Sequence, residues 1–146
     1  MTASMRNLEA VLARFARIPR KVKDAVDAQL KTETGQLTAV MKERAPVNKH
    51  PTASNPAGEL KASVVWGPAR SGWPLRYVIR ATAIGSDNYD YSRAIEFGHR
   101  AKDGEQVPAQ PFFFPTYRAR RSSIRGRISR VARTAMREVF AYYAGQ

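Results

Sequence analysis

The sequence predicts an α+β domain in which a long helical segment, an antiparallel sheet and a basic C-terminal helix pack together. Three observations lead to this prediction. Apolar residues recur every three or four positions over residues 4–44, alternate over residues 60–85, and return to the helical period from residue 117 onward. With 146 residues and 43% hydrophobic content, the chain is expected to form one globular domain over residues 1–146.

Residues 1–45 are predicted to form a long, broken helical arm. Pro19 lacks a backbone donor and crowds the preceding turn, so a helix should start or kink there. Gly35 weakens the second half by about 1 kcal/mol relative to alanine. The stripe is either the domain's own core or is partly shared with a neighbouring subunit. Its members are Leu8, Leu12, Phe15, Ile18, Val22, Val26, Leu30, Leu37 and Met41.

Residues 60–97 are predicted to form the sheet region, an antiparallel sheet of three or more strands. The β-rich runs at residues 60–67 and 75–85 flank the segment 68–74, which suits a hairpin connection or a wider loop. In the second run Leu75, Tyr77 and Ile79 share one face, which should meet the core. Residues 91–97 fit either a helix or a third strand, and the spacing favours the helix slightly.

Residues 115–143 are predicted to form a basic amphipathic helix, with Pro115 suited to its first position. Residues 117–143 contain eight arginines and only one acidic residue, Glu138. The whole chain carries a net charge of +13, which attracts polyanions such as nucleic acid, an acidic membrane surface or an acidic protein. The predicted polyanion or acidic-partner contacts are Arg118, Arg121, Arg125, Arg127, Arg130 and Arg133.

These arginines are compatible with a solvated helix face, with docking against an acidic surface or a DNA channel, or with sequence-reading DNA binding. No known nucleic-acid recognition signature accompanies them. The sequence also contains no recognised catalytic motif, in which nucleophilic or acid–base residues occur at a defined spacing. Cysteine is absent, and His50 and His99 lie in predicted loops. We therefore expect no enzymatic activity, no cofactor and no metal. No apolar run approaches the roughly 20 residues of a membrane span, so no membrane partner is expected.

Residues 91–115 are typical of a docking surface. Three prolines stiffen the track around Phe112, Phe113 and Phe114, which lowers the entropy lost when it is ordered on a partner. Adjacent residues in an extended chain point in different directions, so at least one phenylalanine should face outward, unless all three fill the domain's own core. The predicted subunit or partner interface comprises Glu96, Phe97, Gly98, His99, Pro111, Phe112, Phe113 and Phe114.

Within this surface Glu96 is expected to pair with an arginine across a subunit boundary. Replacing Glu96 or Phe112 with alanine should then leave the monomer folded and reduce assembly. Unfolding of either variant would instead show that the residue belongs to the core.

The order of several short motifs resembles one family. Ala45-Pro46-Val47, the segment 58–64, a Tyr-x-x-x-x-Glu-Phe-Gly block at 91–98, a Pro-Ala-x-Pro-Phe block at 108–112 and a basic helix follow one another. This order, over residues 44–139, resembles the minor tail-component (neck) proteins of lambda-like long-tailed phages. These are head–tail joining, tail-completion or tail-terminator proteins. The chain departs from the family pattern by an insertion at residues 48–57 and by His99, where threonine is common.

The resemblance implies a structural virion protein, assembled in the host cytoplasm. Its copies would form a homo-oligomeric ring around the DNA path at the head-proximal end of a tail. Partners would be neighbouring neck (adaptor or stopper) and tail-tube proteins, with non-specific DNA contact in the lumen. The particle could be a phage or a gene-transfer particle. The alternative function is a basic nucleic-acid-binding protein that acts as a monomer or dimer.

Overall fold

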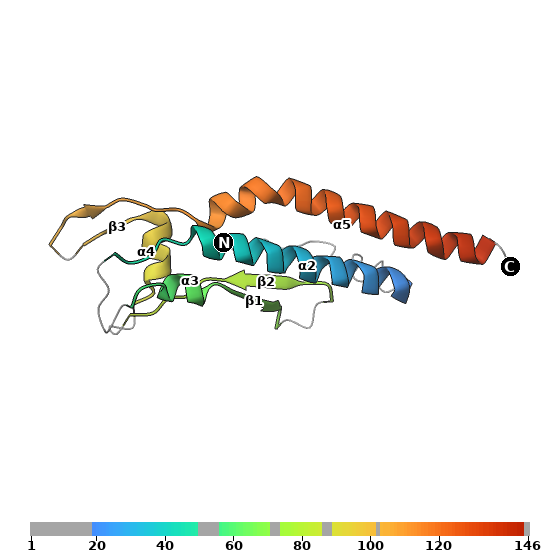
Figure 1. The fold of residues 1–146 in the computed structure, drawn as a ribbon, viewed down its shortest axis with the longest axis horizontal. Helices are drawn as coiled ribbons and strands as arrows, with labels where there is room; N and C mark the ends of the chain where they lie inside the picture. Colours follow the sequence, from blue (N-terminus) through green and yellow to red (C-terminus); the bar gives the residue numbers. More distant parts are fainter. Residues whose placement is uncertain (1–18, 50–55, 71–73, 86–88, 102, 145–146) are drawn as a thin grey trace, which may run out of the picture.

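The computed structural model describes residues 19–49, 56–70, 74–85, 89–101 and 103–144. Of these residues 61% are helical, and they contain only two small antiparallel sheets of two strands each. The predicted sheet of three or more strands is therefore wrong. The α+β class gives way to a mostly helical architecture, although the predicted long C-terminal helix is present (Figure 1).

Two long helices run side by side in opposite directions along the long axis of the molecule (Figure 1). Helix α2 (Arg20–Arg44) begins directly after Pro19, whose carbonyl accepts hydrogen bonds from the Val22 and Lys23 N–H groups. The arm before Pro19, at residues 1–18, lies outside the described residues. Helix α5 (Phe113–Ala144) is continuous. Neither Gly35 nor Gly126 interrupts its helix, because packing between the two helices outweighs the weak propensity of glycine.

The predicted hairpin is present but shorter than the sequence pattern. Strand β1 (Val65–Pro68) pairs antiparallel with β2 (Tyr77–Arg80). The preceding residues, expected to be extended, instead form the short helix α3 (Glu59–Ser63). In Figure 1 helix α2 lies between α5 and the hairpin. The Tyr77 hydroxyl donates to Asp27 of α2 at 2.5 Å and fixes the hairpin to that helix.

The sheet stops at two strands because the chain after β2 binds a helix instead of another strand. Asp90 accepts a hydrogen bond from the Ser92 N–H at 3.1 Å and caps helix α4 (Tyr91–Phe97). The Tyr91 N–H then donates to the Ala83 carbonyl, and the Ser92 hydroxyl to the Ala81 carbonyl, both at 3.0 Å. Residues 91–97 are thus a helix, as the spacing slightly favoured, and they add no third strand to β2. The second sheet is only β3 (His99–Arg100) with β4 (Gln106–Val107).

The core consists of two apolar clusters, one toward each end of the helix pair. The larger contains Leu37, Met41, Ala45, Leu60, Val64, Ala83 and Phe112. The smaller contains Val22, Ala135 and Val139. The helical stripe predicted from the sequence therefore supplies core residues at Val22, Leu37 and Met41.

Candidate functional site

Glu96 lies within the docking surface predicted at residues 91–115 and makes several hydrogen bonds there. Its Oε2 accepts hydrogen bonds from the N–H groups of Phe112 and Phe113 at 2.8 and 3.0 Å, and its Oε1 from that of Phe114 at 2.9 Å. The first N–H groups of a helix have no partner within the helix, and the helix dipole favours negative charge there. Glu96 therefore caps α5 from α4, an arrangement we call the Glu96 clamp. Glu96 thus has partners within its own chain, and its pairing with an arginine of another subunit stays a prediction.

The clamp joins motifs that are separated in the sequence. The Gln110 N–H donates to the Ile95 carbonyl at 2.8 Å, which holds the chain before α5 against α4. At the other end of α4, the Tyr91 hydroxyl donates to Glu59 of α3 at 2.6 Å. Burial and this hydrogen bond raise the pKa of Tyr91, so the hydroxyl stays protonated as a donor. The motifs that carry the family resemblance thus meet in one structural unit.

Gly98 follows the clamp residue at a position that excludes other side chains. Its φ is +76°, and an added Cβ would lie 2.9 Å from the Val107 carbonyl oxygen and 3.0 Å from the Ala109 nitrogen. Both neighbours are backbone atoms, which move only with the whole segment. The glycine of the Glu-Phe-Gly motif is therefore explained by the close approach of residues 107–109.

Replacing Gly98 with alanine should destabilise the protein by about 2 kcal/mol, because backbone strain at positive φ adds to the steric conflict. Urea unfolding of the variant would measure this loss. Gly104→Ala is the matched control: φ there is +91°, but no atom lies within 4 Å of the added Cβ. Equal losses in the two variants would show that the contact with residues 107–109 has no effect.

The eight predicted interface residues lie in different environments. Phe112 is buried in the core at 3% exposure, and Phe113 is half-buried. Phe97 and Phe114 are 64% and 41% exposed, and their ring centroids lie 5.8 Å apart. Pro111 is exposed, whereas Gly98 and His99 are half-buried. The structure therefore brings together one exposed pair, Phe97 and Phe114, which we call the aromatic pair.

This distribution changes the test of the interface. Glu96 is only 6% exposed and Phe112 is a core residue, so their replacement should destabilise the monomer itself. The variants predicted to separate assembly from folding are therefore those of the aromatic pair. The aromatic pair borders a hollow of about 440 Å³ whose rim includes Arg80 and Arg93.

Five of the six predicted polyanion-contact arginines are exposed, and within the described part of the chain they form no ion pair. They are Arg118, Arg121, Arg125, Arg130 and Arg133. Arg121 and Arg125 border a groove beside β2. Arg130, Arg133 and Arg137 share another face, about 60° to 120° around the helix from Arg118, as a rotation of about 100° per residue requires. Sequence periodicity alone did not single out Arg137.

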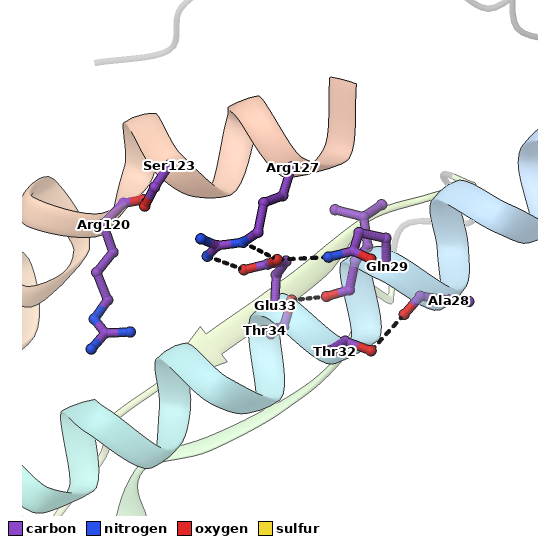
Figure 2. A network of polar contacts seen from close by, with 9 residues as sticks. Ala28, Gln29, Thr32, Glu33, Thr34, Arg120, Ser123 and Arg127 are labelled. Carbon is purple, nitrogen blue, oxygen red and sulfur yellow. Dashed lines mark hydrogen bonds and ion pairs between the residues drawn. The ribbon is translucent and has the colours of Figure 1, made fainter. Parts of the chain in front are cut away.

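Arg127 differs from the other arginines. Its Nε and Nη2 donate to the two carboxylate oxygens of Glu33 at 2.5 and 2.6 Å, and Gln29 donates to the same carboxylate at 2.7 Å (Figure 2). Glu33 is only 3% exposed. The hydrogen bond from Arg127 lowers the pKa of Glu33, although burial acts in the opposite direction. Arg127 therefore joins α5 to α2 and is committed to this contact.

In the described ranges, no group of three or more His, Asp or Glu side chains is placed to hold a metal ion. No helix of those ranges has the length and apolar character needed to cross a membrane. Comparison with protein-family models, curated proteins and solved structures finds no match to this chain.

Proposed function

We propose that this protein is a structural subunit that joins head and tail in a tailed phage or phage-derived particle. Copies of it would form a ring around the DNA path at the head-proximal end of the tail. The observation that supports the proposal best is the exposed aromatic pair on a rigid base. The motif order that resembles neck proteins coincides with the residues that build this base.

The position of the aromatic pair makes it suitable for assembly. Phe97 is the last residue of α4 and Phe114 lies in the first turn of α5, so the Glu96 clamp fixes both backbones. Side chains on a preorganised backbone lose little entropy on binding. Phenylalanine is also among the residues enriched in protein–protein interfaces. An exposed pair of phenylalanines therefore has a ready explanation as a contact between subunits.

The charge distribution is consistent with a DNA path. Arginine side chains of α5 that lack a carboxylate partner in the described residues would otherwise repel one another along the helix. Phosphate groups would neutralise them without base-specific contacts. A ring subunit needs this kind of contact, because the DNA that passes through the ring has no fixed sequence.

Replacing both members of the aromatic pair, as Phe97→Ser with Phe114→Ser, should weaken self-association about tenfold or more. The melting temperature should change little, because both side chains are largely exposed. Sedimentation velocity over a range of protein concentrations would measure the association. Phe140→Ser is the matched control, since Phe140 is 65% exposed near the far end of α5. Unchanged association in the double variant would contradict the assigned interface.

The alternative function, nucleic-acid binding by a monomer or dimer, is favoured by the arginine face of α5. Replacing Arg130, Arg133 and Arg137 with alanine should reduce the slope of log affinity for duplex DNA against log salt by about 3. Fluorescence anisotropy with a labelled duplex would measure it. A triple variant at Lys42, Arg44 and Lys61 removes the same charge elsewhere. Equal effects of the two variants would show that only net charge matters.

Salt separates the two functions. Affinity for DNA that rests on phosphate contacts falls steeply from low to moderate salt, whereas assembly through phenylalanine contacts persists. A protein that stays monomeric or dimeric at every concentration, and whose only interaction is salt-sensitive binding of nucleic acid, would contradict the proposed ring.

A further inference from the structure

Strand β2 has an open edge. The hydrogen bond from the Ala69 N–H to the Arg76 carbonyl, at 3.0 Å, fixes the alternation of the β1–β2 ladder. By this alternation Val78 and Arg80 bond to β1, whereas Tyr77 and Ile79 direct their N–H and C=O groups away from it. Across the described ranges, no hydrogen bond satisfies these outward groups. As far as the described ranges go, they are available to another strand.

The open edge is short and carries one charged residue, Arg80, but it lacks the proline or bulge that would prevent strand addition. It contains no proline, and the register with β1 is continuous from Tyr77 to Arg80. A sheet of two strands is marginally stable by itself, and a third strand stabilises it. Adding an extended peptide to such an edge is a common mode of recognition.

A groove of about 410 Å³ runs along this edge. Helix α2 and helix α5 supply the rest of its lining, so side chains of an added strand would enter an apolar space. Ile79 and Phe113 also border the neighbouring hollow, which extends the groove past the end of β2. The main apolar lining residues are Leu30, Leu37, Met41, Ile79, Phe113 and Ile124.

The groove is rich in positive charge. Arg121 and Arg125 line the α5 side, and Arg80 lies at the end of the edge. None of these three forms an ion pair with another described residue. The carboxylate that lines the groove, Glu33, is committed to Arg127. An occupant must therefore bring negative charge. A second copy of this chain, at a net charge of +13, is disfavoured as the source.

We propose that the open edge of β2 binds an extended acidic segment of a partner protein, which pairs with Tyr77 and Ile79 as a third strand. Apolar side chains on one face of the segment enter the groove, and a carboxylate on that same face lies near Arg121 and Arg125, which line it. Carboxylates on the opposite face lie near Arg80 of β2, where opposite charges across neighbouring strands are stabilising. One copy of the chain contains the complete groove, so binding does not depend on ring formation.

The probe is a set of short labelled peptides that combine valine or isoleucine with glutamate, with glutamate placed on one face or on both faces of the extended peptide. Anisotropy with the full chain should show saturable binding, at least tenfold weaker for Arg121→Glu with Arg125→Glu. Arg133→Glu with Arg137→Glu, the same charge change outside the groove, should bind almost as wild type. A peptide N-methylated at alternate residues should lose binding, because it cannot donate to the β2 edge. In the wild type, hydrogen exchange at the Tyr77 and Ile79 amides should slow when peptide is added.

Three results would overturn strand docking. One is the absence of saturable binding for every acidic peptide in the set. Another is equal weakening by the two charge-reversal pairs, which indicates attraction by net charge alone. The third is unchanged exchange at Tyr77 and Ile79 while peptide is bound, which places the peptide elsewhere. This exchange experiment uses only the wild type, so it also decides the case if a variant fails to fold. The peptide experiments do not use the Phe97 and Phe114 variant. Their outcome is therefore independent of whether that variant loses self-association, and the two proposals can fail separately.

Discussion

Replacing Glu96 with alanine should lower the free energy of unfolding by about 3 kcal/mol. The change removes the acceptor of three backbone N–H groups at the start of α5, which are then left without a partner in a largely buried position. Part of α4 would also lose its connection to α5. Urea unfolding monitored by circular dichroism would measure the loss, which corresponds to a fall of about 10 °C in melting temperature.

Two further variants test the clamp. Glu96→Gln keeps one acceptor oxygen but places an amide group near the remaining N–H donors, so it should retain only part of the stability. Glu43→Ala removes an exposed carboxylate of α2 and should change stability by less than about 0.5 kcal/mol. If Glu96→Ala were as stable as Glu43→Ala, Glu96 would not be a structural cap, and its proposed role in presenting the aromatic pair would be lost.

Removing the partner of a buried charge should have the second large effect. In Arg127→Met the Glu33 carboxylate stays buried with Gln29 as its remaining hydrogen-bond partner, and stranding that carboxylate should destabilise the fold by about 3 kcal/mol. Glu33→Gln should be milder, because the Arg127 side chain is 41% exposed and can turn to water. In a urea titration at neutral pH, Arg127→Met should therefore have a lower free energy of unfolding than Glu33→Gln, because Glu33 is the more deeply buried partner.

The double variant Glu33→Leu with Arg127→Met provides the control. A well-packed apolar pair in place of a buried ion pair is often neutral or stabilising, so much of the stability lost in Arg127→Met should return. If the double variant were less stable than Arg127→Met, the loss would come from packing and not from an unpaired charge.

The same pair predicts a pH dependence. The pKa of Glu33 is lowered, mainly by the hydrogen bond from Arg127, below its ordinary value of 4.5. A carboxyl group with a lowered folded-state pKa stabilises the fold above its unfolded pKa, and this stabilisation is lost as the pH falls through the folded value. Wild type should therefore lose more stability than Glu33→Gln below about pH 4.5. Some acid dependence should remain in Glu33→Gln, because Lys31 and Tyr77 also lower the pKa of Asp27.

The difference in stability between Arg127→Met and wild type should shrink as the pH falls, because burial without Arg127 raises the pKa of the stranded Glu33 carboxyl and its protonation removes the charge. A constant difference from pH 7 down to acid would show that Glu33 is not the group left unpaired.

The sheet shows where sequence patterns were sufficient and where they were not. The β-rich runs at residues 60–67 and 75–85 predicted two strands, because period 2 and β-branched or aromatic residues are local properties. The observed strands at residues 65–68 and 77–80 overlap both runs. The prediction of a third strand was wrong, because the chain beyond Arg80 forms hydrogen bonds to α4. Asp90, two residues before Ser92, was a readable cap signal that decides residues 91–97 in favour of a helix.

The docking surface at residues 91–115 was also predicted only in part from the sequence. Composition and motif order identified Glu96, Phe97 and Phe114 as members of one important segment. They gave no sign that Glu96 accepts N–H groups 16 to 18 residues away, or that Phe112 rather than Phe114 is buried. Backbone donors carry no sequence signature, so a cap supplied by another helix is invisible in a residue pattern.

By itself, the sequence determined the two long helical segments, the hairpin, the excess of arginine on α5 and the small set of residues around Glu96. Helical and strand periods arise from the geometry of neighbouring residues, and net charge is a sum over the chain. Only the tertiary structure decided which arginine is committed, since Arg127 meets Glu33 across 94 residues. It also decided that no described strand pairs with the outer edge of β2, because long-range contacts depend on how the elements pack and not on local spacing.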